Sequence, residues 1–349
     1  MPRRPWSLRL AALAVPAVLS AQDTTFTPGP QYAAGGAHRT WFGAHWRDAW
    51  LRPLSAPIVR VDTIAGGLVP TQVGGGQQTR SLRFAAPDGR EFVFRSMAKD
   101  FTAQLPPSLR GTQIADIVAD QLSAAHPLAP RLAAPILAAL EIPHATPTLV
   151  VLADHVALDT FRTEFGGRAG WLEARPSDDA PVPGRPDLRG EVVSTDDLLR
   201  ELERRPATTL DTTAYLVARL ADLLIGDWDR HEDQWRWVLP AGQTRWLPIP
   251  RDRDQAFSRF DGVLLGLARF SAPQLRVFGP AFGGIGGLVW NARRLDRRLL
   301  AGVPVQAYVD AAATMPARPN ASATEYFTMA TTPATTIGRM SSVWTSDCR

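Results

Sequence analysis

Two acidic loops contain the side chains of this sequence that are best suited to chemistry. The first loop is residues 227–234, DWDRHEDQ, and the second is residues 251–254, RDRD. Carboxylates of this kind bind Mg²⁺ and deprotonate hydroxyl groups. Each loop follows an apolar element, so both can reach one cleft. So many carboxylates in one cleft would repel one another unless cations bound to them. The spacing therefore predicts a site that binds cations.

The first half of the chain contains the elements of a small antiparallel sheet. Short apolar or alternating runs, separated by Gly, Pro and Asp, predict strands at 59–64, 67–73, 80–84, 91–95, 148–152 and 170–175. Apolar residues at helical spacing predict helices at 111–125 and 131–140. A Pro- and Asp-rich loop then marks a boundary between two parts of the molecule.

The second half is predicted to be mainly helical. Helices are expected at 195–204 and 211–224, and the latter is apolar on more than one face, which is typical of a core helix. Two short strands, 235–239 and 245–249, form a hairpin between the acidic loops. The pattern predicts an α+β fold, with an antiparallel N-terminal sheet, a mainly helical C-terminal part and a cleft between them.

This order of parts fits phosphoryl transfer from ATP. That reaction needs backbone N–H groups and a basic side chain for the phosphates, hard oxygen ligands for a metal, and a carboxylate that orients or deprotonates the accepting hydroxyl. A glycine turn between strands, a helix, a core helix and two acidic loops offer these parts in sequence.

The acidic loops also resemble those of known kinases. Residues 229–234 resemble the D-R-H-x-x-N catalytic loop of the phosphoinositide-kinase and HipA-like families, and residues 246–254, WLPIPRDRD, resemble the F-I-P-W-D-x-D segment of the spore-coat CotH kinases. The resemblance implies an atypical, two-lobed protein-kinase-like fold that uses ATP with Mg²⁺ or Mn²⁺. It extends over roughly residues 55 to 300, but its specific part is confined to these loops.

The resemblance also assigns roles within the loops. It implies that Asp229 is the catalytic base, within a motif completed by Arg230 and by His231, which would bond the loop backbone. It implies that Asp252 is the principal metal ligand, with Asp254 as its rival. Gln234 would take the second-metal position; because Gln is a weaker ligand than a carboxylate, Asp233 is an alternative there.

The N-terminal half offers nucleotide-binding residues with the alternatives open. The glycine run Gly74, Gly75 and Gly76 lets the backbone approach a phosphate, or it is a plain flexible hairpin. Arg95 and Lys99 are rival phosphate-binding cations, and Lys99 is expected beyond the end of its strand.

Two acidic residues complete the nucleotide-binding set. Asp120, four residues after Asp116 on one helix face, is expected to pair with Arg95 or Lys99, or to belong to a solvated acidic face. Glu173 lies in the segment 172–176, which occupies the place of a hinge whose backbone groups would meet adenine.

The first residues of the sequence predict a location outside the cytoplasm. Arg3 and Arg4 precede an apolar stretch that ends in small residues at Ala21, which predicts a cleaved signal peptide and a periplasmic or extracellular location. A formal charge of +4 without basic runs excludes nucleic acid as a partner, and no later segment predicts a transmembrane helix. The only cysteine is Cys348, so no internal disulfide is expected.

Five segments follow from these observations. They are a signal peptide at 1–21, an irregular segment at 22–54, an N-lobe at 55–175, a C-lobe at 176–318 and a disordered Ser/Thr-rich tail at 319–349. The leading hypothesis is an exported kinase-like phosphotransferase that acts on Ser/Thr hydroxyls of envelope or secreted proteins. A pseudokinase scaffold that binds an envelope protein is the alternative, and a metal-dependent phosphoester hydrolase is a third hypothesis.

Overall fold

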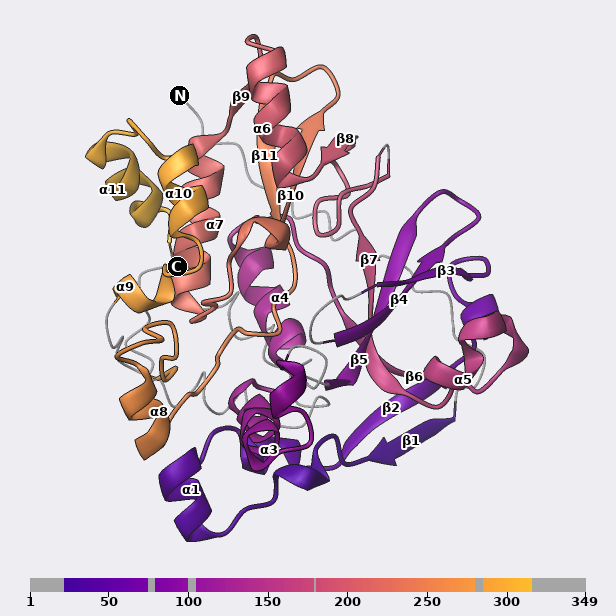
Figure 1. Cartoon of the computed structure of the whole chain (residues 1–349). Helices are drawn as coiled ribbons and strands as arrows, with labels where there is room; N and C mark the ends of the chain where they lie inside the picture. The colour runs from indigo at the N-terminus through magenta and orange to yellow at the C-terminus, as the bar shows by residue number, and fades with distance from the viewer. Residues whose placement is uncertain (1–21, 75–78, 100–104, 179, 280–284, 316–349) are drawn as a thin grey trace, which may run out of the picture.

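The computed structural model describes residues 22–74, 79–99, 105–178, 180–279 and 285–315 (Figure 1). The predicted signal peptide, Gly75 and Gly76, and the predicted tail from residue 319 lie outside these residues. Within the described residues, no helix is both long and apolar enough to cross a membrane.

Seven strands form a mixed, mostly antiparallel sheet on the right-hand side of Figure 1. Their order is β1-β2-β6-β7-β5-β4-β3, and only β2 and β6 run parallel. The bounds are Asp23–Phe26 (β1), Leu54–Val59 (β2), Val69–Gly74 (β3), Thr79–Ala85 (β4), Glu91–Lys99 (β5), Thr148–Leu152 (β6) and Ala169–Arg175 (β7). The predicted α+β class is confirmed, although the sheet is larger than expected.

The two faces of this sheet differ in chemistry because side chains alternate along each strand. Leu82 of β4 and Phe94 of β5 are fully buried in an apolar core on one face. The strand register places Arg83 opposite Val93 and Val93 opposite Glu173, so these three side chains share the other face. That second, polar face carries the cations and acids of the site described below.

A smaller sheet of four strands lies in the second half of the chain. It has the order β8-β10-β11-β9 and the bounds Gly190–Val193 (β8), Thr209–Leu210 (β9), Trp235–Pro240 (β10) and Arg245–Pro250 (β11). The β10–β11 hairpin matches the prediction, whereas β8 and β9 were not predicted. Three buried tryptophans of this hairpin, Trp235, Trp237 and Trp246, pack into a core with Tyr215.

The helices after the N-terminal segment are α3 Gln113–Asp120, α4 Ala129–Ala139, α5 Arg162–Phe165, α6 Thr195–Arg204, α7 Thr212–Leu224, α8 Val263–Ala268, α9 Ile285–Leu288, α10 Arg293–Leu299 and α11 Val305–Ala313. Phe165 of α5 packs into the core of the large sheet, whereas α4, α6, α7 and α10 contribute to the second core. Ala133 and Leu137 of α4, Ala218 of α7 and Leu295 of α10 are all buried in it. Helix α7 is therefore a core helix, as its apolar composition predicted.

The segment predicted to be irregular, residues 22–54, contains regular structure. Strand β1 pairs with β2, and two short helices follow it, α1 Gly36–Phe42 and α2 Arg47–Trp50. Tyr32, Trp46 and Trp50 anchor the segment in a third apolar cluster. Tertiary packing of these aromatic rings, which local composition does not reveal, orders the segment.

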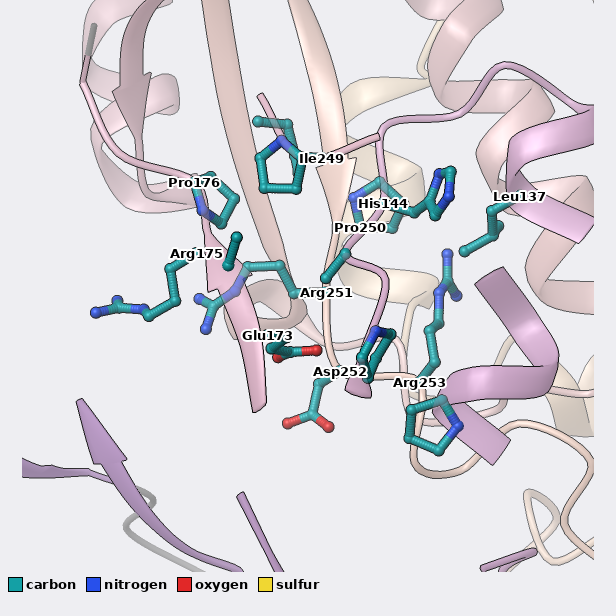
Figure 2. Close-up of a pocket in the computed structure, with 15 residues that line it drawn as sticks. Leu137, His144, Glu173, Arg175, Pro176, Ile249, Pro250, Arg251, Asp252 and Arg253 are labelled. Carbon is teal, nitrogen blue, oxygen red and sulfur yellow. The ribbon is translucent and has the colours of Figure 1, made fainter. Parts of the chain in front are cut away.

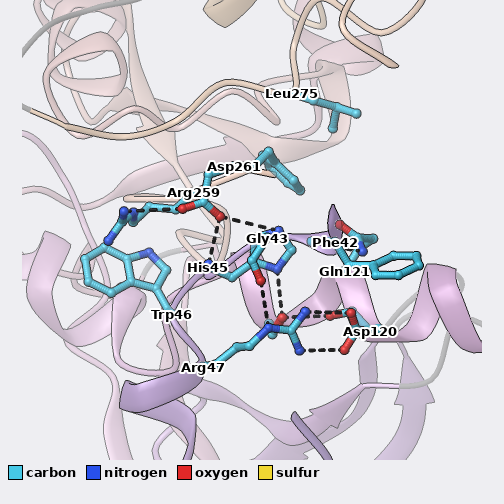
Figure 3. A network of polar contacts seen from close by, with 12 residues as sticks. Phe42, Gly43, His45, Trp46, Arg47, Asp120, Gln121, Arg259, Asp261 and Leu275 are labelled. Carbon is cyan, nitrogen blue, oxygen red and sulfur yellow. Dashed lines mark hydrogen bonds and ion pairs between the residues drawn. The ribbon is translucent and has the colours of Figure 1, made fainter. Parts of the chain in front are cut away.

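A polar network ties this N-terminal segment to two later parts of the chain (Figure 3). His45 Nδ1 lies 2.8 Å from Ser123 Oγ, and the backbone N–H of His45 donates to Asp261 Oδ1 at 2.8 Å. Trp46 Nε1 donates to the carbonyl of Phe257 at 2.7 Å. These contacts fix the segment that follows the second acidic loop.

The buried imidazole of His45 is expected to make stability depend on pH. Burial, opposed by the Asp261 carboxylate, lowers its pKa from 6.5 to about 4. The unfolded state therefore binds more protons than the native state between these values, so the free energy of unfolding falls by roughly 3 kcal/mol as the pH drops through this window.

Urea denaturation of the wild type and of His45→Gln at about pH 7 and about pH 4.5 measures this contribution. The variant is expected to lose less stability between the two pH values than the wild type does. The loss of stability is compared between wild type and variant because other groups, His144 among them, also have a lowered pKa and contribute equally to both proteins. Equal losses in both proteins would contradict the assignment.

Candidate functional site

The second acidic loop and the polar face of the large sheet line one pocket. Its residues include Arg95 and Lys99 of β5, Glu173 of β7, and Asp252 and Asp254 of the loop after β11. The neighbouring pocket in Figure 2 shares Glu173 and Asp252 with it. Strand β5 and the loop after β11 therefore meet in this pocket, although Lys99 and Asp254 are 155 positions apart in the sequence.

Ion pairs connect the strand cations to the acidic loop. Arg95 Nε lies 3.0 Å from Glu173 Oε1, and Arg95 Nη1 lies 3.2 Å from Asp252 Oδ2. Lys99 Nζ pairs with Asp254 Oδ2. All five side chains are at least three-quarters buried, which strengthens these interactions relative to surface pairs.

Lys99 lies inside its strand, so the expectation that it falls beyond the strand end is wrong. Strand β5 runs to Lys99 because Thr79 of β4 pairs with it across a register shift. Although this shift interrupts the regular alternation between them, both side chains reach the acidic loop, Arg95 at Asp252 and Lys99 at Asp254. The structure thus brings both rival cations to the acidic loop.

The two carboxyl groups of the acidic loop have opposite pKa shifts. Burial alone would raise the pKa of Asp252, but Arg95, Lys99 and Arg251 outweigh it and hold that pKa below its usual value. Burial raises the pKa of Asp254 to about 6 against the opposing charge of Lys99, and the negative charges of Asp252 and Asp229 reinforce this rise. Asp252 is therefore ionised at neutral pH and suited to bind a cation.

Asp229 lies in the loop that follows α7. Its Oδ1 accepts a hydrogen bond of 3.0 Å from Asn291 Nδ2, and His231 Nε2 lies 3.9 Å from the same oxygen. A polar cavity of about 370 Å³ adjoins this loop and is lined by His231, Asn291 and Arg294, among others. Asn291 was not predicted, because nothing in its local sequence links it to a position 62 residues earlier.

Arg230 joins the two acidic loops. Its buried guanidinium donates to the carbonyls of Arg251 at 2.6 Å and Gln234 at 3.0 Å. The same group lies 4.8 Å from the ring centroid of Trp235, a cation–π distance. Arg230 is therefore a positioning residue, since it contacts backbone on both loops and has no exposure to the pocket.

The two residues expected at the second-metal position, Gln234 and Asp233, have surroundings other than Asp252. Gln234 Nε2 lies 3.3 Å from His231 Nε2, and the Gln234 carbonyl accepts a hydrogen bond of 2.9 Å from the Arg251 backbone. The Asp233 side chain is 95% exposed. The structure does not bring either side chain to the Asp252 carboxylate, so neither expected second-metal position is formed in this conformation.

A buried charge network underlies the first loop, and the sequence reasoning missed its core. Asp222 of α7 is fully buried and pairs with Arg219 and Arg253, and Arg253 Nη1 also bonds Asp227 Oδ2 at 2.9 Å. The signal that could have revealed it is the i, i+3 pair Arg219–Asp222 within an otherwise apolar helix.

Asp120 does not join the nucleotide-binding cations. Its two oxygens accept bonds of 2.6 Å each from Arg47 Nη1 and Nη2 (Figure 3). His38 Nε2 also lies 3.0 Å from Asp120 Oδ2. Arg47 is completely buried, so it requires this bidentate partner. The expected pairing of Asp120 with Arg95 or Lys99 is therefore wrong.

The described part of the glycine run lies beside the polar face. Gly74 ends β3 opposite Ser81, and Ser81 is itself opposite Arg95. A Cβ on Gly74 would lie 3.1 Å from Ser81 Oγ and 3.4 Å from Arg83 Nε. Glycine at this position leaves the face open above Arg83.

The acidic residues fit the simple requirements of Mg²⁺. Within the described residues, no three His, Cys, Asp or Glu side chains form a ready metal-binding group. Mg²⁺ in phosphate-transfer sites needs only one or two carboxylates, with phosphate and water oxygens as the other ligands. Asp252 and Asp254 supply two carboxylates in one pocket, so the fit is satisfied.

Comparisons with known proteins leave the family open. No family model matches the chain, and no curated protein is significantly similar to it. Among solved structures, the crystal structure of the proinflammatory kinase CtkA of Helicobacter pylori aligns with 74% of this chain and 82% of its own, at 10% identity and a TM-score of 0.32. A similarity at this TM-score is too weak to inform fold or function.

Proposed function

We propose that the protein is an ATP-dependent phosphotransferase with a two-lobed, atypical kinase architecture. The observation that carries the proposal is the meeting of Asp252 and Asp254 with Arg95 and Lys99 in one pocket. Kinases require a strand cation for the phosphates and an acidic loop for the metal at this place. The Asp229 loop, fixed to the Asp252 loop through Arg230, adds the third required part.

Each residue has a role in the proposed reaction. Asp229, oriented by Asn291, accepts the proton of the acceptor hydroxyl. The oxygen of that hydroxyl bonds the γ-phosphorus as the bond between this phosphorus and the β–γ bridging oxygen breaks, which leaves ADP. Arg95 and Lys99 bind phosphate oxygens, and Glu173 holds Arg95 in place. Mg²⁺ or Mn²⁺, held by Asp252 and Asp254, would neutralise phosphate charge.

The proposed setting and substrate come from the sequence. The predicted signal peptide at 1–21 supports export, and Ser/Thr hydroxyls of envelope or secreted proteins are the proposed acceptors. The backbone of residues 172–176, at the end of β7, is the proposed contact for adenine.

A catalytically inactive scaffold is the second candidate, favoured by the state of the acidic loop. Arg95 and Lys99 already neutralise Asp252 and Asp254, and Gln234 faces His231. Such a protein would retain the pocket and bind an envelope partner without transferring phosphate. Phosphoester hydrolysis has less support, because the described residues hold no group of three metal-ligating side chains.

A thermal-shift titration tests the nucleotide site. ATP with Mg²⁺ or Mn²⁺ is expected to raise the Tm of the purified protein, since a ligand at about 100 times its Kd stabilises the native state by about 2.7 kcal/mol. Asp252→Ala is expected to abolish the metal-dependent part of this shift. Asp48→Ala is the matched control, because Asp48 is 74% exposed and pairs with Arg39.

The outcomes separate the two candidates. A metal-dependent shift together with transfer of labelled phosphate from ATP to protein supports the enzyme. No shift with either metal, or an equal shift in Asp252→Ala, would overturn the proposed nucleotide site and favour the scaffold.

A further inference from the structure

An arginine cluster lies beside the proposed phosphotransfer site. It consists of Arg83 on β4, Arg175 at the end of β7, Arg236 on β10 and Arg251 directly after β11. Figure 2 shows the side chains of Arg175 and Arg251 extending to the same side of the pocket, away from Arg253. The cluster thus draws on both sheets and on four separate chain segments.

The members of the cluster are close enough to repel one another. Burial and the charge of Arg83 lower the pKa of Arg175, against the opposing charge of Glu91, and Arg236 acts in the same direction as Arg83. Arg175 and Arg251 line the same pocket, and Arg83 shares a face of the large sheet with Glu173, which lies two residues before Arg175. These arginines therefore share one electrostatic environment although they come from different elements.

Few carboxylates contact these arginines directly, although the charges of Asp233 and Asp197 oppose the repulsion at Arg236. Arg175 pairs with Glu91 at 2.8 Å, and Arg236 Nη1 bonds only the backbone carbonyl of Trp235, at 2.7 Å. Within the part of the chain that the structure describes, Arg83, Arg236 and Arg251 form no ion pair with a carboxylate. All four side chains are partly buried, so solvent screens their repulsion only in part.

The backbone fixes the cluster in place. Arg83 and Arg175 belong to strands paired on both sides, and Arg236 belongs to the central strand β10 of the smaller sheet. Guanidinium groups present donors in a planar fork that matches phosphate oxygens. A polyanion would replace mutual repulsion by such paired bonds, with little loss of backbone entropy.

We propose that Arg83, Arg175, Arg236 and Arg251 form an anion site that binds a phosphate group of a polyanionic ligand. This anion site is separate from the proposed metal and phosphate site at Asp252, and the proposal does not depend on phosphotransfer. The ligand chemistry is phosphate, whether carried by a nucleotide or by an inorganic polyphosphate.

Metal-free binding of tripolyphosphate tests the proposal. In EDTA, sodium tripolyphosphate is expected to raise the Tm of the wild type, and Arg83→Met and Arg236→Met are each expected to weaken the apparent affinity about tenfold or more. Arg205→Met is the matched control, because Arg205 is exposed and lies outside the cluster. ATP in EDTA forms the second arm and shows whether a nucleotide carries the bound phosphate.

Folding of the variants is checked without ligand. Removal of one arginine from a like-charged group is expected to leave the Tm unchanged or raise it, so a loss of binding is not a loss of fold. Arg236→Lys, which keeps the charge but loses the planar fork, is expected to bind tripolyphosphate with intermediate affinity. Equal affinity in wild type, Arg83→Met and Arg236→Met would overturn the proposal, as would no shift at all.

The result is distinguishable from the test of phosphotransfer. Asp252→Ala is expected to retain the tripolyphosphate shift in EDTA while it loses the metal-dependent ATP shift. If ATP with metal gives no shift but tripolyphosphate binds through the arginines, the proposed function fails and the anion site stands. The opposite pattern, metal-dependent ATP binding without arginine-dependent tripolyphosphate binding, contradicts the anion site alone.

Discussion

Asp229→Asn is expected to lower the rate of phosphoryl transfer by about 10²–10⁴-fold, because asparagine cannot accept the proton of the acceptor hydroxyl. The amide oxygen can still accept the hydrogen bond from Asn291, so the loop is expected to keep its conformation. The metal-dependent ATP shift is expected to stay unchanged. Single-turnover transfer of labelled phosphate, with the Tm as a check on folding, measures both effects.

A matched substitution shows that the effect belongs to Asp229. Asp187→Asn also removes one carboxylate, but Asp187 is 59% exposed and pairs with Arg185 outside the pocket. It is expected to transfer phosphate at the wild-type rate. Wild-type activity of Asp229→Asn would show that another group is the base or that none is needed.

Arg253→Met is expected to destabilise the protein by about 3–5 kcal/mol, the largest stability effect that the structure predicts. Asp222 and Asp227 are buried and share the guanidinium of Arg253, so its removal leaves uncompensated negative charge in the interior. Burial already raises the pKa of Asp227 against the charges of Arg230 and Arg253. Urea denaturation measures the change as a lower midpoint at constant m value.

Two further variants identify charge as the cause of that loss. Arg205→Met, which breaks the pairs of this exposed arginine with Glu191 and Glu201, is expected to cost at most about 1 kcal/mol. In a double-mutant cycle, adding Asp227→Asn to Arg253→Met is expected to cost less than the sum of the single changes. Additive costs would show that lost packing, and not unpaired charge, explains the effect.

Local pattern predicted several of the regular elements, but the strand expected at 59–64 is wrong, because β2 ends at Val59 and a 3-10 turn occupies Val61–Thr63. Helix α6 and strand β6 have the predicted bounds, because their apolar spacing is unambiguous and Ser194 caps α6 by accepting from the Asp197 backbone. Strands β8 and β9 escaped prediction because they are short and exist through pairing with β10 and β11. Strand β8 has four residues and β9 has two, and segments this short do not specify their pairing partners.

The site could be predicted only in part. The acidic loops and the rival cations were found because each is recognisable within a few residues. The structure brings the second loop and both cations into one pocket, and Arg230 links the first loop to the second. Asp120 was assigned the wrong partner because Arg47, 73 positions away, is unremarkable in the sequence. The arginine cluster gathers residues from four segments, so no spacing rule could have found it.

The strand order of the large sheet has a consequence for how the protein folds. Strand β5 lies between β4 and β7, yet β7 follows it by some seventy residues in the chain, ending at Arg175. One edge of β5 therefore stays unpaired until that distant strand docks, and contacts of such sequence separation form slowly. During synthesis or refolding, Arg95 and Lys99 would be exposed on an open edge, where their charges discourage pairing with other chains.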